Sequence, residues 1–139
     1  MVSGAQRRES QMTTTQMSDT EQTLTVAKRF EASFNRHDPD ALMADMTEDC
    51  VFEHIEPTGT GFGRHEGQAA VRAVWASLPE HFPNYRFETE DIFATGNRCA
   101  YRWRLTWDLS DGGQGQLRGV DVYTLRDGKI AEKYTYVST

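Results

Sequence analysis

The sequence has few cysteines and lacks the residue spacings that mark metal sites, disulfide frameworks and nucleotide sites. The 139 residues include two cysteines, Cys50 and Cys99, which show no Cys-x-x-Cys spacing and are expected to be buried, reduced thiols. The histidines show no metal-ligand spacing, and the glycines from Gly59 to Gly67 lack the order of a phosphate-binding loop. We therefore expect no metal and no other cofactor, and we read the glycines as a flexible rim of a pocket.

Positive charge and long apolar runs are also scarce. Lys and Arg total 15 against 21 Asp and Glu, so the net charge is -6 and the surface repels phosphate backbones. The charged fraction of 26% argues against a membrane span, and residues 1–22 lack the apolar stretch of a secretory signal. Nucleic acid and membranes are thus not expected as partners, and the sequence predicts a cytoplasmic protein.

Enough apolar residues are present for one core. Domains commonly have about 100 to 150 residues, so this chain fits a single domain. Its hydrophobic fraction is 37% and its aromatic fraction 11%, which is sufficient to fill that core. We expect a polar, disordered leader at residues 1–17 and one folded domain at residues 18–139.

Three helices are predicted in the first part of the domain. Ser18 and Glu21 have the spacing of a capping box, which predicts a helix over residues 18–35. Three charged residues of this helix are expected to face water: Lys28, Arg29 and Glu31.

The second and third predicted helices are shorter. Asp38 suits the N-cap and Pro39 the first turn of the second helix. Its expected apolar residues are Leu42, Met43 and Met46. The third helix is predicted over residues 68–78, and Pro79 is expected to end it.

The remaining segments have β character, and glycine-containing turns separate the later ones. The predicted strands cover residues 50–55, 85–93, 98–107, 117–126 and 130–137. In the 98–107 strand one face is apolar, with Cys99, Tyr101, Trp103, Leu105 and Trp107. Early helices and late, hairpin-linked strands predict an α+β fold, in which helices cover one face of an antiparallel sheet.

Several motifs together resemble a known superfamily. They are the Phe34–Asp38 segment, the acidic step before Cys50, and above all Gly119–Ile130. The chain resembles the nuclear transport factor 2-like superfamily, in particular its SnoaL-like and ketosteroid-isomerase-like members. The resemblance implies three helices packed in a strongly curved antiparallel sheet, with a cone-shaped pocket for a small apolar molecule. It also implies a homodimer.

Asp121 is the residue most strongly expected inside that pocket. Its same-face neighbours on the strand are Leu117, Gly119, Tyr123 and Leu125, so its carboxyl should point to the apolar side. Burial without a cation would raise its pKa and keep it protonated, able to donate a hydrogen bond to an oxyanion. The resemblance matches it to the oxyanion-hole aspartic acid of ketosteroid isomerases. The alternative is that Asp121 faces outward or pairs with Arg118 or Arg102.

His54 is the second candidate catalytic residue. The resemblance places it where ketosteroid isomerases carry their general base, and an imidazole can move a proton at neutral pH. Alternatively, ionised Asp121 orients His54 and the two titrate jointly. The third possibility is an ordinary histidine at a loop edge.

The expected pocket lining is aromatic. It comprises Phe30, Phe52, Trp75, Tyr101, Trp103, Leu105, Trp107 and Tyr123. Two positions depart from the family patterns: the oxyanion tyrosine of the isomerases falls at Phe30, and the catalytic aspartate of the polyketide cyclases falls near Thr135. For the last strand, plain alternation would bury Tyr134 and Tyr136, whereas the resemblance would bury Thr135 and Val137. A β-bulge would reconcile the two.

Two functions remain open on the sequence. The first is a cofactor-independent acid–base enzyme of isomerase, dehydratase or cyclase type, acting on a small apolar, polyketide-like or steroid-like molecule through His54 and Asp121. The second is a non-catalytic domain of the same fold, which binds a small ligand or another protein.

Overall fold

A six-stranded sheet and three helices make up the fold. The computed structural model describes residues 4–55 and 63–138, with side chains from Asp19 onward. The helices are α1 (Gly4–Asn35), α2 (Pro39–Ala44) and α3 (Gln68–His81). The strands are β1 (Met46–Ile55), β2 (Gly63–Glu66), β3 (Arg86–Thr95), β4 (Arg98–Asp108), β5 (Gln114–Arg126) and β6 (Lys129–Ser138). This order confirms the α+β class.

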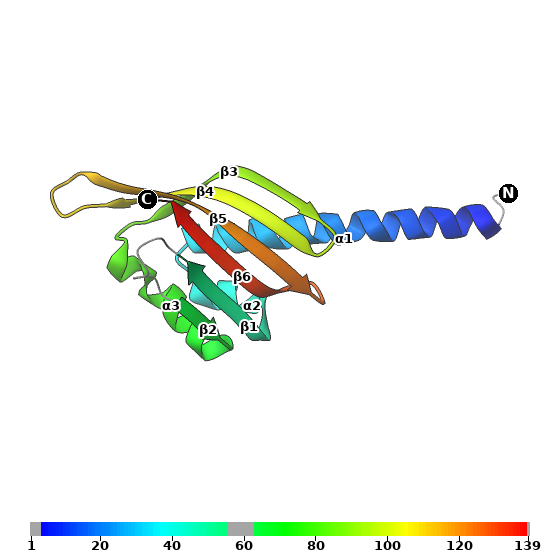
Figure 1. Ribbon diagram of the computed structural model, residues 1–139, viewed down its shortest axis with the longest axis horizontal. Helices are drawn as coiled ribbons and strands as arrows, with labels where there is room; N and C mark the ends of the chain where they lie inside the picture. Colours follow the sequence, from blue (N-terminus) through cyan, green and yellow to red (C-terminus); the bar gives the residue numbers. More distant parts are fainter. Residues whose placement is uncertain (1–3, 56–62, 139) are drawn as a thin grey trace.

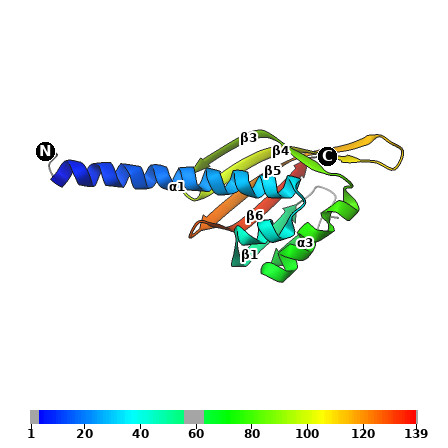
Figure 2. The same ribbon diagram turned by 180° about the vertical axis from the view of Figure 1, so that it is seen from behind.

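The sheet has the strand order β2-β1-β6-β5-β4-β3 and is curved and open. The predicted antiparallel pairing is present at four of the five strand pairs, and β1 and β6 depart from it because they are parallel. The helices lie on one face of the sheet (Figure 2). The parallel pair joins β1, which follows α2, to the last strand, and so brings the first and the last strand of the chain side by side.

The helix boundaries follow the sequence signals in part. The Asp38 carboxylate accepts a hydrogen bond from the Ala41 backbone N–H at 3.1 Å, as predicted for the N-cap of α2. The helix predicted to begin at Ser18 begins instead at Gly4, and its first half projects beyond the sheet (Figure 1). The division into a leader and a domain stays a prediction. Pro79 does not end α3, which continues through it to His81.

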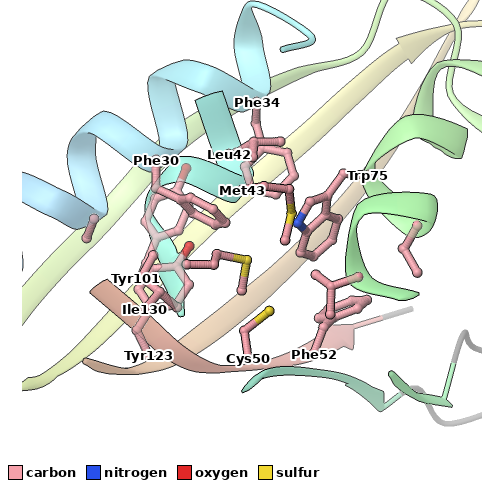
Figure 3. Close-up of a cluster of buried hydrophobic side chains, with 14 of the residues drawn as sticks. Phe30, Phe34, Leu42, Met43, Cys50, Phe52, Trp75, Tyr101, Tyr123 and Ile130 are labelled. Carbon is pink, nitrogen blue, oxygen red and sulfur yellow. The ribbon is translucent and has the colours of Figure 1, made fainter. Parts of the chain in front are cut away.

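The core fills the space between the helices and the inner face of the sheet. Figure 3 shows Phe30 and Phe34 of α1 pointing toward the aromatic side chains of the strands and of α3. Trp75 contacts Phe34 and Phe52, with ring centroids 5.0 and 4.5 Å away. Cys50 and Cys99 are buried free thiols, as predicted. These contacts fix the helices against the concave side, where the candidate site lies.

A β-bulge in β6 settles which side chains of the last strand are buried. Leu125 pairs with Ile130, but Thr124 pairs with Glu132, so one extra residue, Ala131, stands in β6. The bulge changes the parity of the strand after Ile130. Thr135 is therefore buried and Tyr136 is 42% exposed, as the family resemblance implied.

One strand differs from the sequence predictions, and two other expectations concern membranes and homodimer formation. β2 forms where the sequence predicted a loop, and the glycines at 59 and 61 lie outside the described residues. Among the residues that the structure describes, no helix has the length and apolarity needed to cross a membrane. Homodimer formation stays a prediction.

Gly119 lets a tryptophan lie flat on the neighbouring strand. It pairs with Trp103 across β4 and β5, and a Cβ at Gly119 would lie 2.5 Å from the Trp103 ring and 2.9 Å from the Tyr136 carbonyl oxygen. Because both neighbours are packed, we expect Gly119→Ala to lower the free energy of unfolding by about 1–3 kcal/mol. Urea denaturation followed by fluorescence measures this change.

Gly115 is the matched control. A Cβ there would overlap the ring of its cross-strand partner Trp107, which is only half-buried and can swing away. Gly115→Ala should therefore lower the stability less than Gly119→Ala. Equal losses would show that packing against Trp103 is not the cause.

Candidate functional site

An apolar cavity lies between the helices and the concave face of the sheet. Its empty volume is about 590 Å³, including the part open to solvent. Five of the predicted lining residues do line it: Phe52, Trp75, Tyr101, Trp103 and Leu105. The sequence did not predict Phe34, Val74, Leu78, Phe82, Phe87, Leu117 and Val137, which also line it.

Three residues predicted to line the pocket lie elsewhere. Phe30 is fully buried in the core against Tyr123, with ring centroids 5.9 Å apart. Tyr123 is also a core residue, although its hydroxyl reaches the polar part of the site. Trp107 packs against Phe82 at 4.8 Å, beyond the lining itself.

Both predicted catalytic residues line the cavity, on one rung of the sheet. His54 of β1 pairs with Thr135 of β6, Thr135 pairs with Asp121 of β5, and Asp121 pairs with Tyr101 of β4. All four side chains line the same cavity. Since neighbouring strands are about 4.8 Å apart, the backbones of His54 and Asp121 are separated by roughly 10 Å, with Thr135 between them.

Asp121 accepts hydrogen bonds on both carboxylate oxygens. The Thr135 hydroxyl donates to Oδ1 at 2.6 Å, and the Tyr123 hydroxyl donates to Oδ2 at 3.2 Å. Burial raises the pKa of Tyr123 well above its ordinary value, so this hydroxyl keeps its proton as a donor. Asp121 is 3% exposed, and its predicted inward orientation is confirmed.

The expectation that Asp121 is buried without a cation is wrong. The Lys133 ammonium lies 3.0 Å from Asp121 Oδ2 and donates to the Thr135 hydroxyl at 2.7 Å. Neither arginine considered as a partner takes this place, because Arg118 and Arg102 pair with Glu90. Three donors now face the two oxygens of Asp121, an arrangement that suits a carboxylate rather than a protonated acid.

Lys133 is enclosed by aromatic rings as well as by the carboxylate. Its Nζ lies 4.8, 5.1 and 5.7 Å from the ring centroids of Phe52, Trp75 and Phe34. Burial lowers the pKa of Lys133 from its ordinary value, while the ion pair and hydrogen bond with Asp121 act in the opposite direction. Sequence reasoning missed Lys133 because the bulge at Ala131 reverses the parity of the strand.

Glu31 is a further carboxylate of the cavity, and the prediction that it faces water is wrong. It is 8% exposed and accepts a hydrogen bond from the Thr89 hydroxyl at 2.6 Å. Burial raises its pKa to about 7, against the effect of the Thr89 bond, and the charge of Asp121 adds to the rise. A signal was present: Glu31 follows Ala27 by four residues and precedes Phe34 by three, which places it on the buried stripe.

Three hydrogen-bond donors of the cavity have no protein partner among the described residues. They are the Tyr101 hydroxyl and the indole N–H groups of Trp75 and Trp103, all buried. An unpaired buried donor is destabilising by about 1–3 kcal/mol, and a ligand oxygen can relieve this cost. The cavity therefore suits a mostly apolar molecule that carries hydrogen-bond acceptors. In the described part of the chain, no group of three or more His, Cys, Asp or Glu side chains could hold a metal ion.

Comparisons with known proteins agree with this architecture. Residues 27–133 match the model of the SnoaL-like domain. An NTF2-like protein of unknown function from Mesorhizobium loti is 35% identical, with a TM-score of 0.72, and the match covers 86% of this chain and 93% of that chain. No curated protein matches the chain in sequence.

Two more distant structures show the fold alone. TerC, crystallised with polyporic acid, is 20% identical with a TM-score of 0.74, covering 84% of this chain and 92% of that chain. A Kribbella flavida protein named as a ketosteroid isomerase is 22% identical with a TM-score of 0.71, covering 88% of this chain and 82% of that chain.

Proposed function

This chain belongs to the SnoaL-like domain family, and we propose that it is a cofactor-independent enzyme that moves a proton on a small, mostly apolar carbonyl compound. The main support for the proposal is that two carboxyl groups, one imidazole and one amine converge on one apolar cavity. They come from four different elements and are Glu31, His54, Asp121 and Lys133. Such a gathering in a cleft is typical of catalytic sites, because burying these groups does not stabilise a fold efficiently.

Glu31 and His54 are the proposed proton-transfer groups. A general base works best when its pKa is close to the working pH, and Glu31 meets this condition with a pKa of about 7. His54 is the second candidate because an unperturbed imidazole has a pKa close to the same range. Asp121 is engaged by Lys133 and Thr135, so its proposed role in this proton transfer is to hold the charge distribution of the site.

The carbonyl oxygen is proposed to bind at Tyr101. Tyr101 is paired with Asp121 on the next strand, and its buried hydroxyl has no protein partner among the described residues. A donor aimed at an oxygen that gains negative charge stabilises the transition state of proton removal next to a carbonyl. Tyr101 would thus supply the hydroxyl that the family's isomerases carry at the position of Phe30 here.

Deuterium exchange tests this proposal directly. The protein is incubated in heavy water with small aromatic ketones, and exchange of the hydrogens next to the carbonyl is followed by NMR. We expect wild-type protein to accelerate exchange and both Glu31→Gln and His54→Ala to slow it by roughly 10²-fold or more, the usual size of general-base catalysis. The rate should rise with pH through about 7, because the Glu31 carboxylate is the active base.

Arg118→Gln is the matched control, since Arg118 pairs with Glu90 away from the cavity lining and its loss should leave exchange unchanged. A thermal-shift screen of the same ketones, together with phenols and steroids, tests the alternative of a non-catalytic binding domain. Ligands that raise the melting temperature without any exchange would support a binding domain instead of an enzyme.

A further inference from the structure

Lys133 has chemistry that the proton-transfer proposal does not use. Its side chain is 6% exposed, yet it lines the cavity, so a bound ligand can reach the nitrogen. The other two lysines of the chain, Lys28 and Lys129, are exposed. Among the three lysines, Lys133 is therefore the one that is both buried and in the lining of the cavity.

A structural role does not account for this lysine. A buried ion pair is often no more stabilising than apolar side chains of the same volume, because both charges lose their hydration. Besides Asp121 and Thr135, three aromatic rings surround Nζ, and an apolar side chain would fit among these rings equally well. An amine at this place is better explained by a reaction.

We propose that Lys133 is a nucleophile that forms a Schiff base with the carbonyl carbon of a small aldehyde or ketone in the cavity. The inference rests on the proposed function in one respect, namely that the ligand is a carbonyl compound. It goes beyond it by assigning a covalent intermediate. Lysines that act in this way are found in apolar pockets, where burial favours the neutral amine, and burial has this effect on the pKa of Lys133.

Asp121 acts first as proton acceptor and then as proton donor in the reaction. Lys133 passes one proton to the Asp121 carboxylate 3.0 Å away, which leaves a neutral amine beside a carboxylic acid. The amine lone pair attacks the carbonyl carbon, a C–N bond forms, and the oxygen takes the proton that the nitrogen loses. The resulting carbinolamine then loses its hydroxyl as water, with the proton supplied by Asp121, while the nitrogen lone pair forms the C=N bond.

The step is balanced without another reactant. An ammonium and a carbonyl compound give an iminium ion and one water, and Asp121 returns to the carboxylate. The rings of Phe34, Phe52 and Trp75 that face Nζ would also face the iminium cation, which cation–π contact stabilises. Thr135 forms hydrogen bonds with both Nζ and Asp121 and so holds the two groups next to each other.

Reductive trapping tests the proposal on the whole chain. The protein is incubated with benzaldehyde or propanal and sodium cyanoborohydride, which adds hydride to an iminium carbon and leaves a stable secondary amine. Peptide mass mapping then gives the extent of labelling at each lysine. We expect Lys133 to be labelled roughly ten-fold or more faster than Lys28 and Lys129, because the cavity holds the carbonyl beside the amine.

The small number of lysines allows a clean control. In the variant Lys28→Arg/Lys129→Arg, Lys133 is the one remaining lysine, and labelling should persist. Adding Lys133→Arg, which keeps the positive charge beside Asp121, should abolish labelling at this position. A urea concentration of about 8 M should unfold the chain. Under this condition the labelling rate at Lys133 should fall to that of the other lysines.

Two outcomes would overturn the inference. One is modification of Lys28 and Lys129 by both aldehydes while Lys133 stays unlabelled in the folded protein. The other is an equal rate at Lys133 in folded and unfolded chains. Trapping without deuterium exchange would keep the Schiff base and remove the proposed function, whereas exchange without trapping would do the reverse.

Discussion

Asp121→Asn will lower the free energy of unfolding by about 3–5 kcal/mol, because it leaves the Lys133 ammonium buried without a counter-charge. The loss is large against the 5–15 kcal/mol by which domains are usually stable. Urea denaturation at neutral pH measures it. The asparagine keeps the size of the side chain, so a cavity does not contribute to the change.

A double variant separates the charge effect from general damage. Asp121→Asn/Lys133→Met removes both charges and places a flexible apolar side chain among the rings of Phe52 and Trp75. It should recover on the order of 1–3 kcal/mol relative to Asp121→Asn alone, the range of coupling energies between contacting residues. A double variant less stable than the single one would contradict the view that unpaired charge is the cause.

An exposed ion pair that includes another residue of β5, the strand of Asp121, supplies the comparison. Arg118 pairs with Glu90 on the exposed side of the sheet, where water screens both charges. Arg118→Gln should barely move the denaturation midpoint. If it were as destabilising as Asp121→Asn, burial would not be what distinguishes the two pairs.

The inward position of Asp121 could be predicted from the sequence because its strand is regular. Leu117, Tyr123 and Leu125 share its parity, and no bulge lies between them and Asp121. The family resemblance placed His54 at the general-base position of ketosteroid isomerases, and the structure brings both side chains to one cavity.

The partners of Asp121 could not be predicted in the same way. Lys133 reaches it because one extra residue, Ala131, changes the parity of β6, and a single-strand pattern does not reveal a bulge that depends on pairing with β5. The parallel pairing of β1 with β6 is likewise a long-range contact that local periodicity does not encode. The rung that joins His54 to Asp121 exists only because of it.

Glu31 was missed for a different reason. Its identity as a charged residue outweighed its spacing, although Ala27 and Phe34 mark the same face of α1. The structural consequence is a carboxyl that prefers its neutral form in the folded protein, with a pKa of about 7 against an ordinary 4.5. That preference has a measurable effect on stability.

Wild-type protein should lose stability relative to Glu31→Gln as the pH rises from 4.5 to 8. Below 4.5 the carboxyl is neutral in both folded and unfolded chains, so burial carries no charge penalty. Between 4.5 and about 7 the unfolded chain releases the proton while the folded chain still holds it, and this favours unfolding. The difference should grow to at most about 3 kcal/mol and then level off.

Denaturation of both proteins at several pH values measures this difference, and Gln keeps an oxygen that can accept the Thr89 hydrogen bond. Glu90 serves as a control because it should show the opposite pH dependence. Arg118 lowers the pKa of Glu90, so the contribution of the Glu90 carboxylate to stability is lost as the pH falls. A wild-type-to-Glu31→Gln difference that does not vary with pH would mean that Glu31 titrates normally. Since the same titration should set the pH dependence of deuterium exchange, the stability difference should level off where the exchange rate does, at about pH 7.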